Sequence, residues 1–312
     1  MGLQTNPAVQ ESSPAATATY QAWEQNSVSN PGHWNVYAKP RAGGATWKLN
    51  VRDTAAYTPS PVTGGTETII YQQAHGSSSN LYYYNLASRT RKALPAKVNS
   101  SAWEYYGVAS TKYVAFMRLT STARTLLLYN RSSGRIARIA SIRPRCGWCL
   151  QANWVGTSHL LYTVCSYSAD TCNVRVLTIG GSTVTVPRQH PGLYSNWAAA
   201  MDESTGDIYF GQSTAYCGLF ASIARWNLDG GIPTILYDFP EGFDINGIAS
   251  LAPDTATPGN LDVLYSQYDC LAQNSDNYEL QSANTLSASH ATARATRPVA
   301  TRRVRRGAGT GP

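Results

Sequence analysis

Residues 114–139 read VAFMRLTSTARTLLLYNRSSGRIARI and hold three short apolar runs separated by polar turns. The runs end at Phe116, Tyr129 and Ile139, and the second turn ends at Gly134. Short apolar runs bounded by Ser, Thr, Asn and Gly are typical of β-strands joined by turns. The stretch therefore predicts consecutive short strands.

The same order of runs recurs along the chain. Runs equivalent to the one ending at Phe116 end at Tyr20, Tyr71, Tyr162, Phe210 and Tyr265. Runs equivalent to the one ending at Ile139 end near Leu49, Leu94, Val186 and Leu236. A further short segment precedes each aromatic run, so each period holds four strands. Four strands in about 45 residues is the period of a propeller blade.

We therefore predict an all-β fold, a single β-propeller over residues 1–286, most simply with six four-stranded blades. Each recurring aromatic residue is expected to lie on a blade face and to pack against the neighbouring blade. Five blades with a shared closure and a two-sheet sandwich are the alternatives. The approximate blades are 5–50, 55–98, 101–140, 150–188, 193–238 and 244–286, of which the first and last have the weakest pattern.

Composition and charge restrict the class of protein. The 20 Tyr and 8 Trp against 5 Phe suit half-buried sheet surfaces. The formal charge is +7, but six Arg lie in the last 32 residues, which contain no acid. The folded part is therefore expected to be nearly neutral, which does not indicate specific nucleic-acid binding. The tail, residues 287–312, is predicted to be disordered. No apolar run reaches the ~18 residues of a transmembrane segment, and a monomer is expected.

The six cysteines are predicted to lie in loops of one propeller face. Disulfide bonds are expected because the number is even and the chain is rich in Tyr, Thr and Ser. Disulfide bonds imply an extracellular or cell-envelope location. The N-terminus, however, shows no signal-peptide pattern. Either a leader is missing from this sequence or the thiols are reduced in a cytosol. The expected disulfide cysteines are Cys165 with Cys172 at a hairpin tip, Cys217 with Cys270 between adjacent blades, and the Cys146–Cys149 pair.

The Cys146-Gly-Trp-Cys149 motif leaves two alternatives open. Two close cysteine pairs are also typical of a zinc site. A redox-active CxxC normally stands at a helix N-terminus in a βαβ unit, which this sequence lacks. The prediction is structural disulfides, with no metal site and no cofactor.

Residues 125–135 (TLLLYNRSSGR) and 225–231 (RWNLDGG) carry a family resemblance. A strand ending in Tyr or Phe, a Leu-Tyr-x-Asn segment, a Gly turn and a Leu-ended strand together resemble the TolB-like six-bladed propellers. The resemblance covers about residues 5–286 and departs from the family at the Trp-Ser-Pro-Asp-Gly-like turn, reduced here to Ala-Pro-Asp254. It implies a cell-envelope or secreted interaction module; some members are joined to peptidase domains.

The predicted function is non-catalytic binding of a protein or glycan through the loops of the cysteine-bearing face. Tyr and Trp side chains in loops supply rigid contact area. The alternative is a lyase or glycosidase that uses loop carboxylates and a His at the channel mouth, which requires inward-pointing carboxylates. No GxSxG motif of a serine hydrolase is present. The candidate ligand-binding residues are Tyr57, Trp148, Tyr167, His190, Tyr216, Tyr268 and Asp269.

Overall fold

The computed structural model contains strands and turns, and no helix, among the residues that it describes. None of the described segments is a helix long and apolar enough to cross a membrane. The described residues are 9–27, 30–51, 54–144, 146, 149–166, 171–189, 195–214, 221–239, 243–253, 261–269 and 278–284.

The strands form antiparallel units of consecutive strands, which we number in chain order. Unit 1 contains β1 (Val9–Ala16), β2 (Tyr20–Ser27), β3 (Asn30–Pro40) and β4 (Trp47–Lys48). Unit 2 contains β5 (Ala56–Thr63), β6 (Thr68–His75), β7 (Ser78–Asn85) and β8 (Thr90–Ala93). Unit 3 contains β9 (Trp103–Ser110), β10 (Tyr113–Leu119), β11 (Arg124–Asn130) and β12 (Ile136–Ile142).

Unit 4 contains β13 (Leu150–Val155), β14 (His159–Ser166), β15 (Thr171–Thr178) and β16 (Thr183–Thr185). Unit 5 contains β17 (Ser195–Asp202), β18 (Asp207–Ser213), β19 (Ala221–Asn227) and β20 (Gly230–Asp238). Unit 6 contains β21 (Phe243–Pro253), β22 (Leu261–Asp269) and β23 (Tyr278–Asn284).

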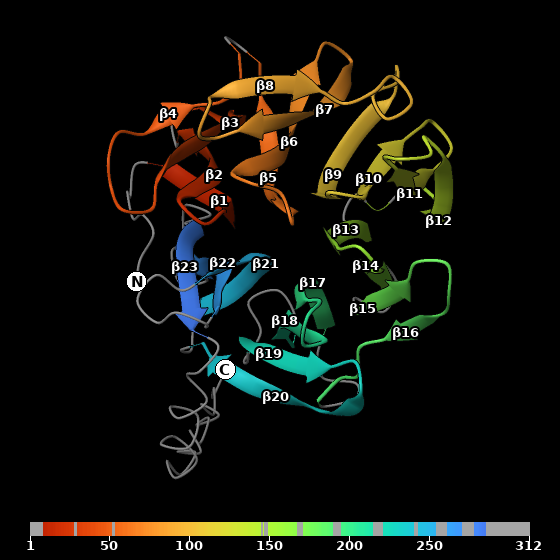
Figure 1. Ribbon diagram of the computed structural model, residues 1–312. Helices are drawn as coiled ribbons and strands as arrows, with labels where there is room; N and C mark the ends of the chain where they lie inside the picture. The colour runs from red at the N-terminus through yellow and green to blue at the C-terminus, as the bar shows by residue number, and fades with distance from the viewer. Residues whose placement is uncertain are drawn as a thin grey trace, which may run out of the picture.

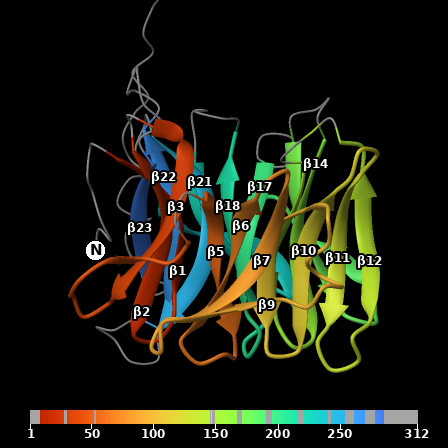
Figure 2. The same ribbon diagram turned by 90° about the horizontal axis from the view of Figure 1, so that it is seen from above.

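The units are arranged around a common axis, with the first strand of each unit innermost (Figure 1). The innermost strands contact one another in sequence, and β21 contacts β1, so the ring closes. Figure 2, in which the ring is seen edge-on, shows strands running between its two faces. The fold is therefore all-β and a propeller, as predicted. The count of six blades stays a prediction, because a short parallel pairing of β5 with β9 joins units 2 and 3 into one sheet.

The recurring aromatic residues form the core between units, as expected. Tyr71 packs with buried residues of units 1 and 2, and Phe116 packs with Ile70 and Leu81 of unit 2. Tyr162, Phe210 and Tyr265 likewise lie in clusters shared with the preceding unit. Each aromatic side chain thus stabilises the contact between two neighbouring units through apolar burial.

The prediction for the first unit was wrong by three residues. Tyr20 is only partly buried, and it begins β2. Trp23 occupies the position equivalent to Tyr71, is 1% exposed and stacks on Tyr37 with ring centres 6.3 Å apart. Tyr20 matched the apolar run by its local sequence, but the pairing of β2 with β1 places Trp23 inside.

Unit 6 closes the ring against unit 1. Arg41 reaches Asp262 of β22 at 3.5 Å. The Ser250 hydroxyl donates to the Pro14 carbonyl across the same junction at 3.2 Å. Ala16, Ala252 and Leu264 complete an apolar contact there. Small side chains and polar contacts thus close the ring at this junction.

On the face that carries the turns between first and second strands, a glutamate from one unit caps the turn of the unit before it. Glu203, between β17 and β18, accepts hydrogen bonds from the backbone N–H groups of Thr157, Ser158 and His159 at 2.8 to 3.0 Å. Glu67 similarly accepts from Thr17 and Thr19 in unit 1. These carboxylates join neighbouring units by accepting hydrogen bonds from groups in the turn of the preceding unit.

Glu203→Gln is expected to lower the free energy of unfolding by about 1–3 kcal/mol at pH 7, because the amide cannot accept all of these hydrogen bonds. Burial raises the pKa of Glu203, but the donors from Thr157, Ser158 and His159 outweigh it and lower the pKa below its usual 4.5. The stabilisation is therefore present above pH 4.5 and is lost as the pH falls through the lowered value.

Urea unfolding between pH 7 and pH 3 measures this effect. The wild type should lose more stability on acidification than Glu203→Gln does. Asp229→Asn, in the exposed turn after β19, serves as the control and should match the wild type. Equal unfolding midpoints for the wild type and Glu203→Gln at pH 7 would refute the role of this carboxylate.

Candidate functional site

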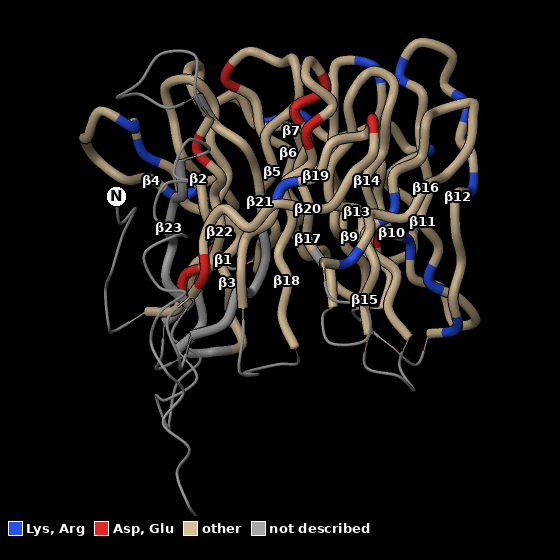
Figure 3. The backbone as a smooth tube through the Cα atoms, turned by 90° about the horizontal axis from the view of Figure 1, so that it is seen from below, with Lys and Arg blue, Asp and Glu red and all other residues tan. Residues whose placement is uncertain are grey.

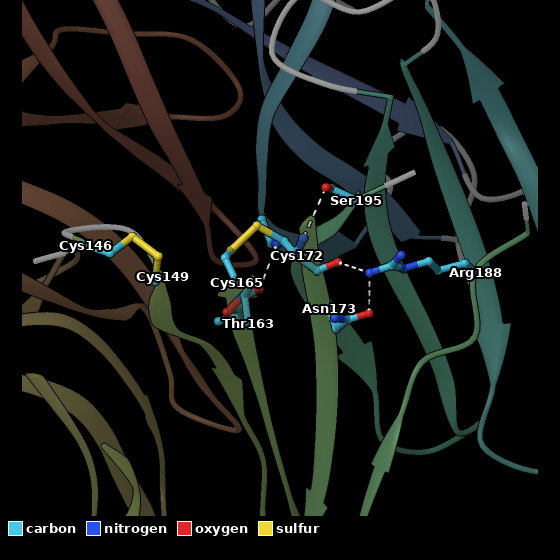
Figure 4. The surroundings of a disulfide bond; sticks show 10 residues. Cys146, Cys149, Thr163, Cys165, Cys172, Asn173, Arg188 and Ser195 are labelled. Atoms are coloured by element: carbon cyan, nitrogen blue, oxygen red, sulfur yellow. Dashed lines mark hydrogen bonds between the residues drawn. A yellow bond between two sulfur atoms is a disulfide. The ribbon is translucent and has the colours of Figure 1, made fainter. Parts of the chain in front are cut away.

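Two disulfides lie side by side at one end of the ring (Figure 4). Cys146–Cys149 precedes β13, and Cys165–Cys172 joins β14 to β15, with Cα atoms 3.9 Å apart. All four side chains are buried and form one cluster. We call this end, with the turns between second and third strands and the connections between units, the cysteine face. The structure thus contains two of the predicted bonds, although Cys165 and Cys172 lie within paired strands and not in loops.

Hydrogen bonds tie the paired ends of β14 and β15, at Cys165 and Cys172, to their surroundings. The Cys165 N–H donates to the Cys149 carbonyl at 2.8 Å, which ties the hairpin to the CxxC segment. The Cys172 N–H donates to the Ser195 hydroxyl of unit 5 at 3.1 Å. Arg188 donates to the Cys172 carbonyl and to the Asn173 side chain on the same edge. The hydrogen bond to Ser195 therefore joins units 4 and 5 at this face, and the two disulfides restrain unit 4 itself.

The innermost strands share a second feature, a bulge at corresponding positions. Ser13, Thr58, Tyr106 and Ala198 all have left-handed backbone angles, with φ between 41° and 52°, and Asn153 occupies the matching register shift in β13. A bulge inserts one extra residue into a strand, and this residue departs from the alternation of side chains between the two faces of the sheet. All five residues are partly exposed on strands whose two sheet faces are covered by neighbouring units. They lie on the innermost strands, which surround the axis, and we call them the axial positions.

Glu24 of β2 lies next to three of the innermost strands. Its carboxylate accepts from the Ser13 hydroxyl at 2.9 Å and from the Thr58 N–H at 2.7 Å. Burial raises the pKa of Glu24 above its usual 4.5, and the hydrogen bonds from Thr58, Ser13 and Ser12 offset this only in part. Burial and the nearby Glu24 charge raise the pKa of Tyr106 to about 12, and the same two causes raise that of Tyr57.

We call Glu24 with Ser13, Tyr57, Thr58 and Tyr106 the Glu24 group. This group can bind polar ligand groups at the axis. The two carboxylate oxygens can accept about four hydrogen bonds, and Ser12, Ser13 and Thr58 donate three of them. The partly exposed Tyr57 and Tyr106 offer rings and hydroxyl groups beside it. Acid catalysis of glycoside hydrolysis needs a second carboxylate across the scissile bond. Among the described residues, Glu24 is the carboxylate that lies beside both tyrosines.

Of the predicted ligand-binding residues, the structure places Tyr57 in this group. Tyr268 and Asp269 are the last two residues of β22, without described side chains. Trp148, Tyr167, His190 and Tyr216 lie outside the described residues, as do Cys217 and Cys270. Sequence reasoning missed Glu24 and the axial positions. The available signal for Glu24 was an acid directly after Ala22 and Trp23 in β2, which reads YQAWEQNS.

The four described cysteines do not provide a metal site in this structure, because both pairs are joined as disulfides and zinc binds thiolates. Within the described part of the chain, no group of three or more His, Cys, Asp and Glu side chains could hold a metal ion.

No protein-family model matches the sequence, and no curated protein matches it either. Solved structures match its fold. TolB from Acinetobacter baumannii has a TM-score of 0.51 at 12% identity, over 80% of this chain and 59% of that protein. A putative TolB from Agrobacterium tumefaciens has a TM-score of 0.52 at 14% identity, over 73% of this chain and 81% of that one.

The β-propeller domain of the Trilobed protease from Pyrococcus furiosus has a TM-score of 0.54 at 10% identity, over 88% of this chain and 95% of that chain. The chain thus spans less than two thirds of the Acinetobacter protein and nearly all of the Pyrococcus domain. Identities this low describe architecture alone. Together with the ring of antiparallel units, they show that the chain has a TolB-like β-propeller fold.

Proposed function

We propose that this protein is a non-catalytic propeller, secreted or associated with the cell envelope, that binds a protein or glycan through its cysteine face. The observation that carries the proposal is the pair of adjacent buried disulfides at that face. Structural disulfides persist in oxidising compartments outside the cytoplasm. They also tie Cys146 to Cys149 and β14 to β15, and this restraint lowers the entropy cost of binding.

Aromatic and polar groups support the same face. Tyr57 is the second residue of β5, at the end of this strand near the cysteine face, and it lies beside Glu24. Tyr side chains supply contact area at low conformational cost. Trp148 and Tyr167 belong to the same segments as the two disulfides in the sequence. These features favour recognition of a ligand that covers the face and reaches the axis.

Capture from a secreted or envelope fraction of native cells tests the proposal. Wild-type protein should retain a partner that a triple variant, Tyr57→Ala with Trp148→Ala and Tyr167→Ala, retains at least tenfold less, since aromatic anchors dominate binding energy. Ile232→Ala is the matched control, because Ile232 is 82% exposed near the turn that precedes β20 at the opposite end. A glycan array probed with the same proteins covers carbohydrate ligands.

Loss of capture by Ile232→Ala together with full capture by the triple variant would contradict the assignment of the face. Catalysis is tested separately by incubating the wild type and Glu24→Gln with any captured ligand. Cleavage of the ligand by the wild type and not by Glu24→Gln would overturn the non-catalytic part and support the lyase or glycosidase alternative.

A further inference from the structure

The near-neutral body of the protein hides a strong separation of charge. Residues 86–144 contain eleven Lys and Arg and a single acid, Glu104. The rest of residues 1–286 contains eight Lys and Arg and seventeen Asp and Glu. The formal charges are therefore +10 for this segment and −9 for the remainder. Summing charge over the whole folded part conceals this difference.

The basic residues lie on the outer side of units 2 and 3. Figure 3 shows blue segments gathered along β11 and β12. β8 and β12 are the two outermost strands of the sheet that these units form. We call the exposed Lys and Arg of this region the basic rim: Arg89, Arg91, Lys92, Lys97, Arg131, Arg135, Arg138 and Arg143.

Contacts between the two units make the rim continuous. Lys97 of unit 2 donates to the Gly134 carbonyl in the β11–β12 turn at 3.2 Å. The Arg131 guanidinium lies 5.1 Å from the ring centre of Tyr83, whose cross-strand partner is Lys92. Charges that are distant in sequence thus meet at one junction.

The local acid does not neutralise the rim. Glu104 is fully buried and pairs with Arg118 at 2.8 Å. None of the ion pairs found in the described part of the chain joins an acid to a residue of the rim. Like charges this close repel one another within the ~10 Å screening length at 0.1 M salt. The arrangement therefore opposes folding slightly and favours an anionic partner.

Protection of exposed sheet edges is the alternative explanation for charges on outer strands. It predicts similar charges on the outer strand of each unit. β4 carries Lys48, whereas β16 reads TVT and β20 reads GGIPTILYD, with no Lys or Arg. Five of the eight residues of the basic rim lie outside β8 and β12, which edge protection does not explain: Arg89, Lys97, Arg131, Arg135 and Arg143.

We propose that the basic rim binds an anionic polysaccharide through its carboxylate or phosphate groups. Guanidinium groups, which dominate the rim, match these anions with paired hydrogen bonds. An extended polyanion can contact units 2 and 3 at once. The choice of a polysaccharide over a nucleic acid rests on the extracytoplasmic location argued from the disulfides. The binding itself is independent of the cysteine face.

Fluorescence anisotropy with labelled polygalacturonate and the full chain tests this proposal. The salt concentration is varied over roughly 20–200 mM, the range over which counterion effects are measured. Lys92→Gln with Arg135→Gln and Arg138→Gln should weaken binding about tenfold or more and flatten the salt dependence, because fewer counterions are displaced. Lys48→Gln with Arg175→Gln and Arg225→Gln removes the same charge elsewhere and should leave the affinity within about twofold of the wild type. Neutral dextran should not bind.

Four results would overturn the proposal. The first is equal binding by the wild type and the rim variant. The second is an equal loss in the Lys48, Arg175 and Arg225 variant, which would show a response to net charge alone. The third is a loss confined to a tail variant with Arg302, Arg303, Arg305 and Arg306 changed to Gln. Tighter binding of random-sequence duplex DNA than of polygalacturonate would refute the polysaccharide assignment.

Discussion

Phe116→Ala is expected to lower the free energy of unfolding by about 3–5 kcal/mol, the range for removing a buried aromatic side chain. Phe116 is 0% exposed and lies in the cluster that joins unit 3 to unit 2. Its removal leaves a cavity between units 2 and 3, where the other large side chains of the cluster remain, so collapse should be incomplete. Urea unfolding followed by Trp fluorescence measures the change.

The control for Phe116→Ala is Ile232→Ala, which truncates a side chain that is 82% exposed and should change the stability by less than about 0.5 kcal/mol. A loss below about 1 kcal/mol for Phe116→Ala, with an unchanged unfolding slope, would contradict the packing of Phe116 between units.

The double variant Cys165→Ala with Cys172→Ala is expected to lose about 2–3 kcal/mol. The bond closes a short loop, with a sequence separation of 7, for which the chain-entropy model gives about 2.5 kcal/mol. Both side chains are buried, so alanine also removes a little apolar contact. Urea unfolding without reductant measures the loss.

Adding reductant separates the disulfide from the change of side chain. It should destabilise the wild type more than it destabilises the double variant, which retains only Cys146–Cys149 of the two described bonds. Labelling of the unreduced wild type under denaturing conditions should leave these four cysteines unmodified. Labelling of all four would refute the disulfides and with them the argument for an oxidising compartment.

The fold was predictable because its repeat depends on local sequence. Aromatic residues recur at blade spacing, and the predicted fourth blade, 150–188, agrees closely with β13 to β16, which end at Thr185. Trp23 was missed because its position depends on how β2 pairs with β1, which the run ending at Tyr20 does not encode. Closure by Arg41 and Asp262 joins residues 221 apart in sequence, so no local pattern reveals it.

The candidate site was less predictable. Cys165 and Cys172 flank a short polar segment, so their pairing follows from the hairpin. The residues of the Glu24 group lie on β1, β2, β5 and β9. Their burial therefore depends on the packing of several units around the axis. The bulge at Thr58 is a property of two paired strands and has no fixed sequence signature. The basic rim was present in the sequence, but a whole-body charge hides it.

Hydrogen–deuterium exchange of the protein alone and with its captured partner tests the central claim, that the cysteine face is the binding face. The proposal predicts slower exchange at residues 54–58, 149–152 and 164–166, which lie at or near that face. Slower exchange confined to residues 64–67 and 203–206, the turns at the opposite end of the ring, would contradict it.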